Sequence, residues 1–396
     1  MTSRQQWGLA TGGWVAYVVY YLGRTNLSVA VPGLESEGGL GPQDIGLLVA
    51  SFFWVYSLTQ VIVGQLADRF GSRWLVGVGL VGSGVMNALF IHADSFALAL
   101  IWWSLNGMFQ GLGWPPLIAG LSRWLTGPRA AQASAAYGTS YVAGTVLTLA
   151  AGGFIVAWGG TAAVFNVAAV VLILAGIIWF VMVRDPVPRG HHSTRRSSSM
   201  LPTLWLMPAA ALVGVGWMTL VIWTPEYLTS VLGMSISSAG LNAAAMAAVS
   251  LPVMVLVSLR FRSAIGRRSS RIAGAVIVIT GLSFLLVPWS HGDVWVLGAF
   301  ALATSLANAS SSIVLGFLPR VSAPERVGLA SGIFSLSFSV GGGFGALIIG
   351  GLIGEGSWDI VYFVAGAAAV LGALWIFAWS MMSDRPTRDL SPLRAT

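Results

Sequence analysis

The sequence predicts an all-α membrane protein with twelve transmembrane helices arranged as two pseudo-symmetric six-helix bundles. Three observations lead to this prediction. The 396 residues are 56% hydrophobic and 8% charged, whereas soluble proteins contain about 25% charged residues. Apolar runs of the roughly 20 residues that a membrane-spanning helix needs recur along the whole chain. The arginines between these runs fall in every second loop.

The apolar runs are bounded by charged residues, proline or glycine. A polar segment rich in arginine and serine, Arg184 to Ser199, separates the sixth run from the seventh and predicts a flexible linker. We therefore expect an N-terminal six-helix bundle over residues 1–183, a cytoplasmic linker over 184–201, and a C-terminal six-helix bundle with a short cytoplasmic tail over 202–396. The twelve predicted helices lie near residues 7–31, 44–66, 73–92, 95–121, 131–157, 161–183, 202–228, 237–259, 271–290, 293–318, 327–353 and 358–382.

The charges in the predicted loops set the orientation. One set of alternate loops carries the arginines, and the other set carries acidic residues and no arginine. Arginine-bearing loops face the cytoplasm, so both termini and the linker are expected to be cytoplasmic, with the chain in the cell (inner or plasma) membrane. The arginine loops hold Arg69, Arg73, Arg123, Arg129, Arg260, Arg271, Arg320 and Arg326, and the acidic loops hold Glu35, Glu37, Asp44, Asp94, Asp293, Glu355 and Asp359.

The two predicted bundles share features at near-constant offsets of about half the chain, which indicates a duplicated six-helix unit. The shared prolines and arginines carry more weight than the glycines, because glycines match by chance in a glycine-rich chain. The matched pairs are Pro32 with Pro225, Arg123 with Arg320, Arg129 with Arg326, and Gly144 with Gly342.

The composition excludes several kinds of chemistry. Without cysteine, the chain has no disulfide, thiolate metal site or cysteine nucleophile. The four histidines lie in predicted loops without convincing ligand spacing, and no P-loop lysine accompanies the glycine run Gly341–Gly345, which is expected to allow close helix packing. The net charge of +7 reflects basic loops in a chain with few charges. We expect no cofactor, no metal, no nucleic-acid partner and no enzymatic activity.

Arg24 is the predicted centre of the functional site, because it lies within the first apolar run without a charged neighbour. A charge at membrane depth costs at least about 2.5–3.5 kcal/mol on insertion scales, and such residues usually face a water-filled cavity and mark a substrate pathway. The alternative is that its side chain extends to the outer membrane interface. Tyr17 and Tyr21 share a helical face with Arg24, and their hydroxyls are suited to an oxyanion or a polyol; the alternative for them is packing.

The segment GQLADRFGSR, Gly64 to Arg73, resembles the helix 2–3 signature of the major facilitator superfamily. Here a small residue at Gly64 permits close helix approach, Gly71 makes a tight turn, and Asp68 accepts hydrogen bonds from a neighbouring helix N-terminus. The resemblance implies that this loop, with Arg69 and Arg73, locks the cytoplasmic gate. The alternative is that the arginines only anchor the topology.

The first predicted helix contains YY-x-x-R-x-N-x-S-x-A-x-P, which resembles two sister families within that superfamily. These are the organophosphate:phosphate antiporters and the anion:cation symporters of sugar acids. F-x-W-x-Y-x(3)-Q at residues 52–60 is similar to the sugar-acid branch, and residues 110–116 are similar to the organophosphate branch. The resemblance implies that Arg24 binds an anion. It also implies that tyrosines line the cavity, namely Tyr17, Tyr21 and Tyr56.

The sequence departs from both sister families. Trp217 stands where the organophosphate pattern has a second arginine, Gln60 where it has a lysine and Tyr141 where it has a histidine. Gly23 and Gln110 stand where the sugar-acid symporters have acidic residues. A single arginine suits a singly charged carboxylate better than a phosphate dianion. The candidate substrate-binding residues are Arg24, Tyr17, Tyr21, Tyr56, Gln60, Gln110, Tyr141 and Trp217, whereas Asn26, Asn242 and Asn308 are expected mainly to form interhelical hydrogen bonds.

Together these features imply an alternating-access secondary transporter of a small organic anion, which is a sugar acid, another carboxylate or an organophosphate. We expect a monomer in the lipid bilayer that exchanges its substrate for a counter-anion. Coupling to protons is not expected, because Glu226 is the only acid near a candidate site and is predicted to lie at the outer rim. The alternatives are a proton-coupled or efflux carrier of another small solute, and a transporter-like sensor that binds its ligand and signals to a partner.

Overall fold

The structure is a computed structural model, and it describes residues 3–125, 133, 136–184, 204–262, 267–290, 292–321 and 327–382. The regular elements within these residues are all α-helices, which confirms the predicted all-α class. The first group of helices is α1 (Ser3–Leu22), α2 (Asn26–Ser36), α3 (Pro42–Ile91), α4 (Phe96–Gly111), α5 (Trp114–Trp124), α7 (Ser140–Gly159) and α8 (Thr161–Met182). The second group is α10 (Met207–Ser230), α11 (Ile236–Arg262), α12 (Arg267–Trp289), α13 (Asp293–Val321), α14 (Val327–Gly354) and α15 (Trp358–Met382).

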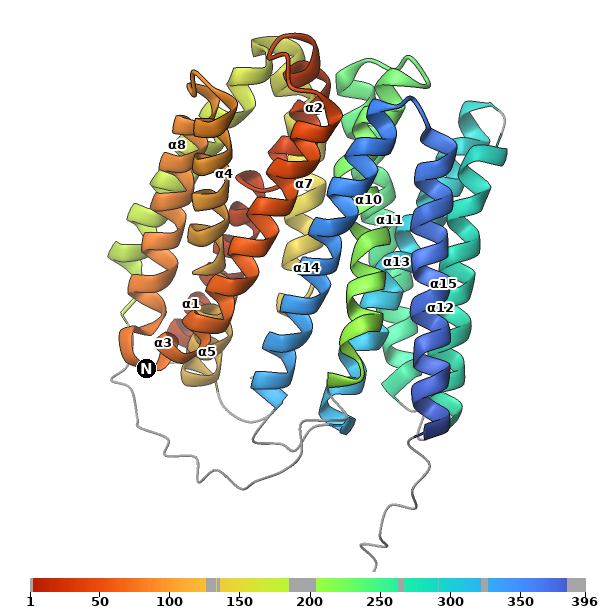
Figure 1. Cartoon of the computed structure of the whole chain (residues 1–396). Helices are drawn as coiled ribbons and strands as arrows, with labels where there is room; N and C mark the ends of the chain where they lie inside the picture. The colour runs from red at the N-terminus through yellow and green to blue at the C-terminus, as the bar shows by residue number, and fades with distance from the viewer. Residues whose placement is uncertain are drawn as a thin grey trace, which may run out of the picture.

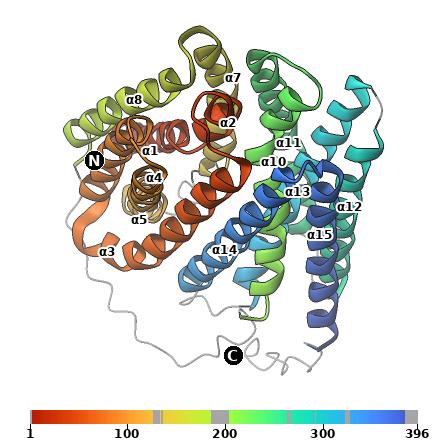
Figure 2. The same ribbon diagram turned by 45° about the horizontal axis from the view of Figure 1, so that its top comes forward.

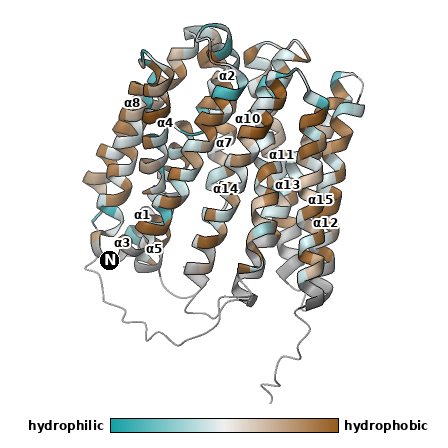
Figure 3. Cartoon of the chain, viewed as in Figure 1, coloured by the Kyte–Doolittle hydropathy of each residue, from teal (hydrophilic) through white to brown (hydrophobic). Residues whose placement is uncertain are grey.

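The lengths and hydropathies of these helices fit a multi-pass membrane protein. Nine stretches within the described residues are long and apolar enough to cross a membrane, and they coincide with nine of the predicted spans. The other three predicted spans correspond to α1 with α2, α4 with α5, and α12. Hydrophobic residues recur along the helices (Figure 3). Many large apolar side chains are exposed, and those of Ile178, Val181 and Leu256 are more than half exposed. Such a surface is stable against lipid.

Two helices that were predicted to be continuous are broken in the structure. The predicted helix near 7–31 is α1 followed by α2, and the predicted helix near 95–121 is α4 followed by α5. Gly23 lies in the first break, where a Cβ atom would lie 2.9 Å from Nδ2 of Asn87 and 3.1 Å from Oγ of Ser83, so glycine allows α3 to approach the backbone. The second break precedes Pro115 and Pro116, which lack the amide hydrogens that would continue the hydrogen bonding of α4.

The long helix α3 contains two predicted spans, near 44–66 and 73–92, which are joined by a turn at Gly71. Gly71 has φ 75° and ψ 168°, a conformation that glycine adopts far more readily than other residues, so the tight turn predicted there is confirmed. A Cβ atom added to Gly64 would have no atom of the described residues within 4 Å, so the close helix approach expected there stays a prediction.

The two groups of helices stand side by side (Figures 1 and 2), and they meet chiefly where α3 packs against α14, α7 against α11, and α2 against α10. Glycines allow close approach in two of these pairs. A Cβ added to Gly46 would lie 2.6 Å from the carbonyl oxygen of Ala346, and one added to Gly153 would lie 2.8 Å from that of Ile236. The predicted close packing of Gly341–Gly345 is also seen, since Cβ atoms added at most of its positions would meet α10 or α3.

The chain enters and leaves the fold at the same end. α1 begins and α15 ends at the bottom of Figure 1, as expected for an even number of spans. The opposite end carries the ends of α2 and α10 and the starts of α3 and α11; we call it the outer end because its loops lack arginine. Most of the predicted linker and the C-terminal tail lie outside the described residues.

Candidate functional site

The break between α1 and α2 lies at the centre of the candidate site. Gly23, Arg24 and Thr25 leave the helix, although the amide of Thr25 still donates to the carbonyl oxygen of Tyr21 at 2.9 Å. A break frees backbone groups that a continuous helix would pair, and within a membrane protein these groups must find other partners. Side chains from α3 and α4 provide them.

Buried amide side chains hold the broken backbone in place. Asn106 Nδ2 donates to the carbonyl oxygen of Gly23 at 2.8 Å, and Asn87 Nδ2 reaches the same oxygen at 3.3 Å. Gln110 Nε2 donates to the carbonyl oxygen of Tyr20 at 2.9 Å. These hydrogen bonds hold the backbone of the break in place, and with it the direction of the residue that follows Gly23.

That residue is Arg24, whose side chain is 8% exposed and does not extend to the outer interface. Its Nη2 donates to Oε1 of Gln110 at 3.2 Å, and its Nη1 donates to the hydroxyl of Tyr21 at 3.4 Å. Neither partner is a carboxylate, and the buried Nε has no hydrogen-bond partner among the described residues. The site therefore holds a positive charge that neutral groups surround, with a donor left over for an anion.

Aromatic rings enclose the guanidinium group. Its central carbon lies 4.4 Å from the ring centre of Tyr56, 4.8 Å from that of Tyr21 and 5.8 Å from that of Phe52. These distances suit cation–π attraction. Tyr17 packs edge-on against Tyr21 at 5.6 Å between ring centres. The three predicted tyrosines are thus brought together around Arg24. Phe52 was not predicted, although its place one turn before Tyr56 in the same motif was a usable signal.

The second group of helices contributes a smaller polar cluster centred on Asn308 of α13. Trp217 Nε1 donates to Oδ1 of Asn308 at 3.0 Å, and the hydroxyl of Tyr141 approaches the same oxygen at 3.3 Å. Tyr141 also packs against Tyr21, with 6.3 Å between ring centres. Tyr141 and Trp217, two predicted substrate-binding residues, therefore contact the same side chain. That side chain is Asn308, which was expected mainly to form interhelical hydrogen bonds.

Two sets of hydrogen bonds join the two groups of helices near the residues that surround Arg24. One turn after Arg24, Ser28 Oγ donates to the carbonyl oxygens of Val221 and Ile222 in α10, at 2.8 and 2.9 Å. One turn after Tyr56, Ser335 Oγ of α14 donates to Oε1 of Gln60 at 2.8 Å, while Gln60 Nε2 donates to the Tyr56 hydroxyl at 2.7 Å. The guanidinium group is covered in this conformation.

The loop predicted to lock the cytoplasmic gate is only partly described. The side chains of Asp68 and Arg69 lie outside the described part of the structure, so their gating role stays a prediction. Arg73 Nε donates to the carbonyl oxygen of Phe180 in α8 at 3.0 Å. This contact fastens the start of the second span of α3 to a helix of the same group.

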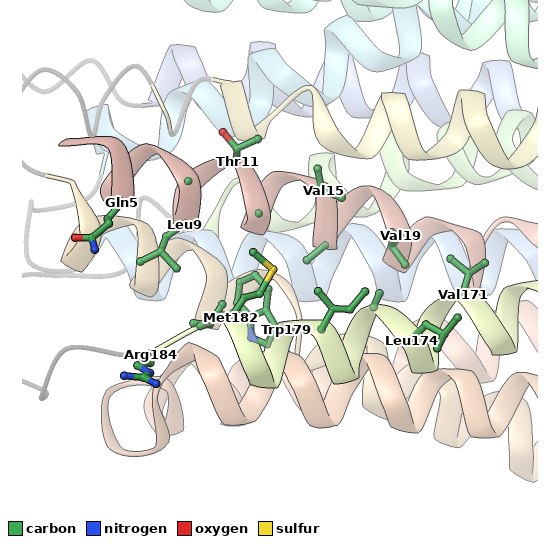
Figure 4. A pocket seen from close by; sticks show the side chains of 16 residues that line it. Gln5, Leu9, Thr11, Val15, Val19, Val171, Leu174, Trp179, Met182 and Arg184 are labelled. Carbon is green, nitrogen blue, oxygen red and sulfur yellow. The ribbon is translucent and has the colours of Figure 1, made fainter. Parts of the chain in front are cut away.

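A groove of about 830 Å³ lies elsewhere, between α1 and α8 on the flank of the first group (Figure 4). Its lining is mainly apolar, with Val15, Val19 and Leu174 along its length and Gln5 and Arg184 at one end. None of the predicted substrate-binding residues lines it. The candidate site is therefore the cluster around Arg24 and not this groove.

Comparison with known proteins identifies the class to which this fold and site belong. The family model described as Major Facilitator Superfamily matches residues 13–319 and 263–395. The chain belongs to the major facilitator superfamily. That membership also confirms the expectation that the protein is not an enzyme, since the related proteins and the fold are those of transporters.

Three relatives indicate where in the superfamily the chain is most similar. It is 28% identical over 171 residues to a probable hexose phosphate transport protein of Chlamydia pneumoniae, covering 43% of this chain and 38% of that protein. It is 34% identical over 111 residues to the membrane sensor protein UhpC of Escherichia coli (strain K12), covering 28% and 25%. It is 24% identical over 421 aligned residues to probable anion transporter 1, chloroplastic, of Oryza sativa subsp. japonica, covering 96% and 77%. The first two matches span less than two fifths of the relatives' own lengths.

Solved structures share the fold. A bacterial homolog of the human lysosomal transporter Spinster, in an inward-facing and occupied conformation, superposes with a TM-score of 0.78 at 17% identity over 96% of both chains. A D-xylose-proton symporter superposes with a TM-score of 0.72 at 15% identity over 93% of this chain and 97% of that chain. These likenesses support the two-bundle fold alone.

Proposed function

We propose that the protein is an alternating-access secondary transporter that moves a small organic anion across the membrane. The observation that carries this proposal is Arg24, a buried cation at a helix break, held by neutral side chains with one unused donor. Broken helices that line a site between two bundles are a common way for transporters to bind substrate near the membrane midplane. The phosphate-ester and anion transporters among the relatives support the same substrate class.

The site favours a substrate with one ionised group and several hydroxyls. Arg24 is the only cation that the described residues bring to the cluster, so one carboxylate or one phosphate monoester is the anionic group that it can neutralise. The hydroxyls of Tyr21, Tyr56 and Tyr141 and the amide of Gln60 supply hydrogen-bonding groups for a polyol. Sugar acids and small organophosphates both have this combination of groups.

The unit boundaries and orientation form part of the proposal. The N-terminal bundle is residues 1–183, the C-terminal bundle is residues 202–396, and the linker between them is cytoplasmic together with both termini. The positive-inside distribution of arginines supports this orientation in the cell membrane. The contacts between the bundles within one chain support a functional monomer, and a second anion is the proposed counter-substrate.

Thermal unfolding of the purified protein with a panel of candidate anions tests the substrate class. The panel contains glycerol 3-phosphate, a hexose phosphate, an aldonate, a hexuronate and a small dicarboxylate. A ligand present at about 100 times its Kd adds about 2.7 kcal/mol to the stability of the folded state. One member should raise the unfolding temperature, and a panel without any effect would count against an organic-anion site.

A second candidate function is ligand sensing without transport, and one observation favours it: the 34% identity to a membrane sensor protein over 111 residues. A sensor and a transporter both bind the anion, but only a transporter moves it. Uptake of the stabilising anion into proteoliposomes separates the two functions. A carrier of cationic drugs is disfavoured, because Arg24 would repel a positively charged substrate.

A further inference from the structure

Two carboxylates lie at the outer end, where the bundles meet. Glu35 is the last residue but one of α2, and Glu226 lies in the last turns of α10. The two helices pack against each other, and the Ser28 hydrogen bonds to α10 fasten them two turns below Glu35. The Glu35 and Glu226 carboxyl groups are close enough to interact electrostatically. They belong to different bundles.

Both carboxyl groups are poorly compensated. Glu226, which was predicted to lie at the outer rim, is 6% exposed, and its buried Oε2 has no hydrogen-bond partner among the described residues. Oε1 of Glu35 is also buried without a partner. An ionised carboxylate removed from water without a counter-charge is strongly destabilised, and a like charge beside it adds to the effect.

The other helices around this pair bring no compensating positive charge. α7 and α8 contain no Asp, Glu, His, Lys or Arg, and the arginines of α11 lie at its far end. The other titratable groups near the ends of α2 and α10 are Glu37 in the cap of α2, and Tyr227, which interacts with Asp359. None of them is a cation that could neutralise the pair.

We infer that the pair of Glu35 and Glu226 holds one proton when α2 and α10 are in contact, and that losing this proton opens the outer end. The proton comes from water on the outer side, and its binding reduces the charge of the pair from two negative charges to one. Two buried carboxyl groups near each other cannot both ionise without repulsion, and protonation of one of them removes this repulsion.

A proton fits the pair better than a metal ion does. Calcium takes six to eight oxygen ligands, and no group of three or more His, Cys, Asp or Glu side chains that could hold a metal occurs within the described residues. Because the pair lies at the outer end, its proton enters and leaves on one side of the membrane. The pair therefore makes closure of the outer end depend on the outside pH without carrying protons across the membrane. This dependence is compatible with the anion exchange proposed above. The assignment of the outer side rests on the proposed function.

The experiment measures the distance between the outer ends of the bundles and needs no substrate, so it is independent of the proposed transport function. The chain has no cysteine, so Ala97→Cys in α4 and Val294→Cys in α13 introduce the only thiols for spin labels, at exposed positions in the first and second group of helices. Distances are recorded by double electron–electron resonance at about pH 5.5 and about pH 8.5, on either side of the range in which coupled carboxyl groups titrate.

The protein without acid substitutions should shift its population toward the longer distance as the pH rises. Glu226→Gln and Glu35→Gln, which each retain a neutral hydrogen-bonding group at one member of the pair, should keep the short distance at both pH values. Glu37→Gln, at the exposed end of α2, is the matched control and should retain the full pH response.

Two results would overturn the inference. In the first, both glutamine variants, shown to be folded by thermal unfolding, keep the same pH response as the protein without acid substitutions. In the second, sodium or calcium at about pH 8.5 restores the short distance, which would mean that a metal ion and not a proton occupies the pair. Using one variant from each bundle keeps the test valid if one of them fails to fold.

Discussion

At the scale of single residues, Arg24 is distinguished by its partners, which are all neutral. Gln110 and Tyr21 accept its hydrogen bonds, and the ring of Tyr56 lies 4.4 Å from the guanidinium carbon. Neutral partners orient the side chain and leave its charge available. A carboxylate at the position of Gln110 would instead form an internal ion pair with Arg24 and compete with an anionic substrate.

Replacing Arg24 should remove anion binding without unfolding the protein. Arg24→Gln should weaken binding of the stabilising anion by about 2–5 kcal/mol, the usual effect of removing one partner of a buried charge pair. Arg24→Lys should restore little, because an ammonium group lacks the planar fork of donors. The measurement is the ligand-induced rise in unfolding temperature. Arg184→Gln, at an exposed arginine outside the site, is the control, and unchanged affinity in folded Arg24→Gln would refute the assignment.

Gln110 also donates to the carbonyl oxygen of Tyr20 at the helix break, beside its contact with Arg24. Gln110→Ala should lower the stability of the folded state by about 1–3 kcal/mol, because it removes this hydrogen bond and leaves the buried Nη2 of Arg24 without its acceptor. Asn242→Ala is the matched control, since the Asn242 amide bonds the carbonyl oxygen of Ser238 in its own helix. Denaturant unfolding in detergent compares the variants. Equal losses of stability would show that Gln110 does not support the break.

At the scale of elements, hydropathy predicted the positions of the helices but not the two breaks. Apolar periodicity reports which residues avoid water, and residues on both sides of a break within the membrane avoid water equally. The break at Gly23 depends on Asn106 and Gln110, which lie far along the chain and donate to the carbonyl oxygens at the break only once α4 packs beside α1. Such partners cannot be found from the local sequence. In contrast, the turn at Gly71 was predictable, because its sequence motif is local.

Replacing Asp68 tests whether the loop that contains the Gly71 turn controls the conformational change of transport. Asp68→Asn should lower the turnover of transport while changing the equilibrium affinity for the anion little, because the residue is predicted to act at the gate and not at the binding site. Initial rates in proteoliposomes, combined with thermal-shift affinities, separate the two quantities. An unchanged rate would leave the loop with only the role of anchoring the topology.

At the scale of the whole molecule, the duplicated sequence appears as repeated packing. Gly144 of α7 lies against Tyr21 of α1, and Gly342 of α14 lies against Met218 of α10, so corresponding glycines contact the corresponding first helix of each bundle. The family resemblance also predicted that Tyr21, Tyr56 and Gln110 gather around Arg24, but it did not predict Phe52. The burial of Glu226 was not predictable, since it depends on how α2 of one bundle meets α10 of the other.

The two bundles contribute unequal charge to the site. The residue of the C-terminal bundle that corresponds to Arg24 in the repeat is Trp217, which is uncharged. With one fixed positive charge and no titratable acid beside it, the empty site leaves a buried cation uncompensated, which is unfavourable. The empty protein should therefore change conformation slowly, whereas the anion-loaded protein should change it readily. This difference favours exchange of one anion for another over net uptake.

The most direct measurement of this account is uptake of the labelled stabilising anion into proteoliposomes, with and without unlabelled anion inside. We expect internal anion to accelerate uptake strongly, an imposed pH gradient alone to accelerate it little, and Arg24→Gln to abolish it. Fast uptake driven by the pH gradient into liposomes without internal anion would contradict exchange, and undiminished uptake by Arg24→Gln would contradict the central claim that Arg24 binds the transported anion.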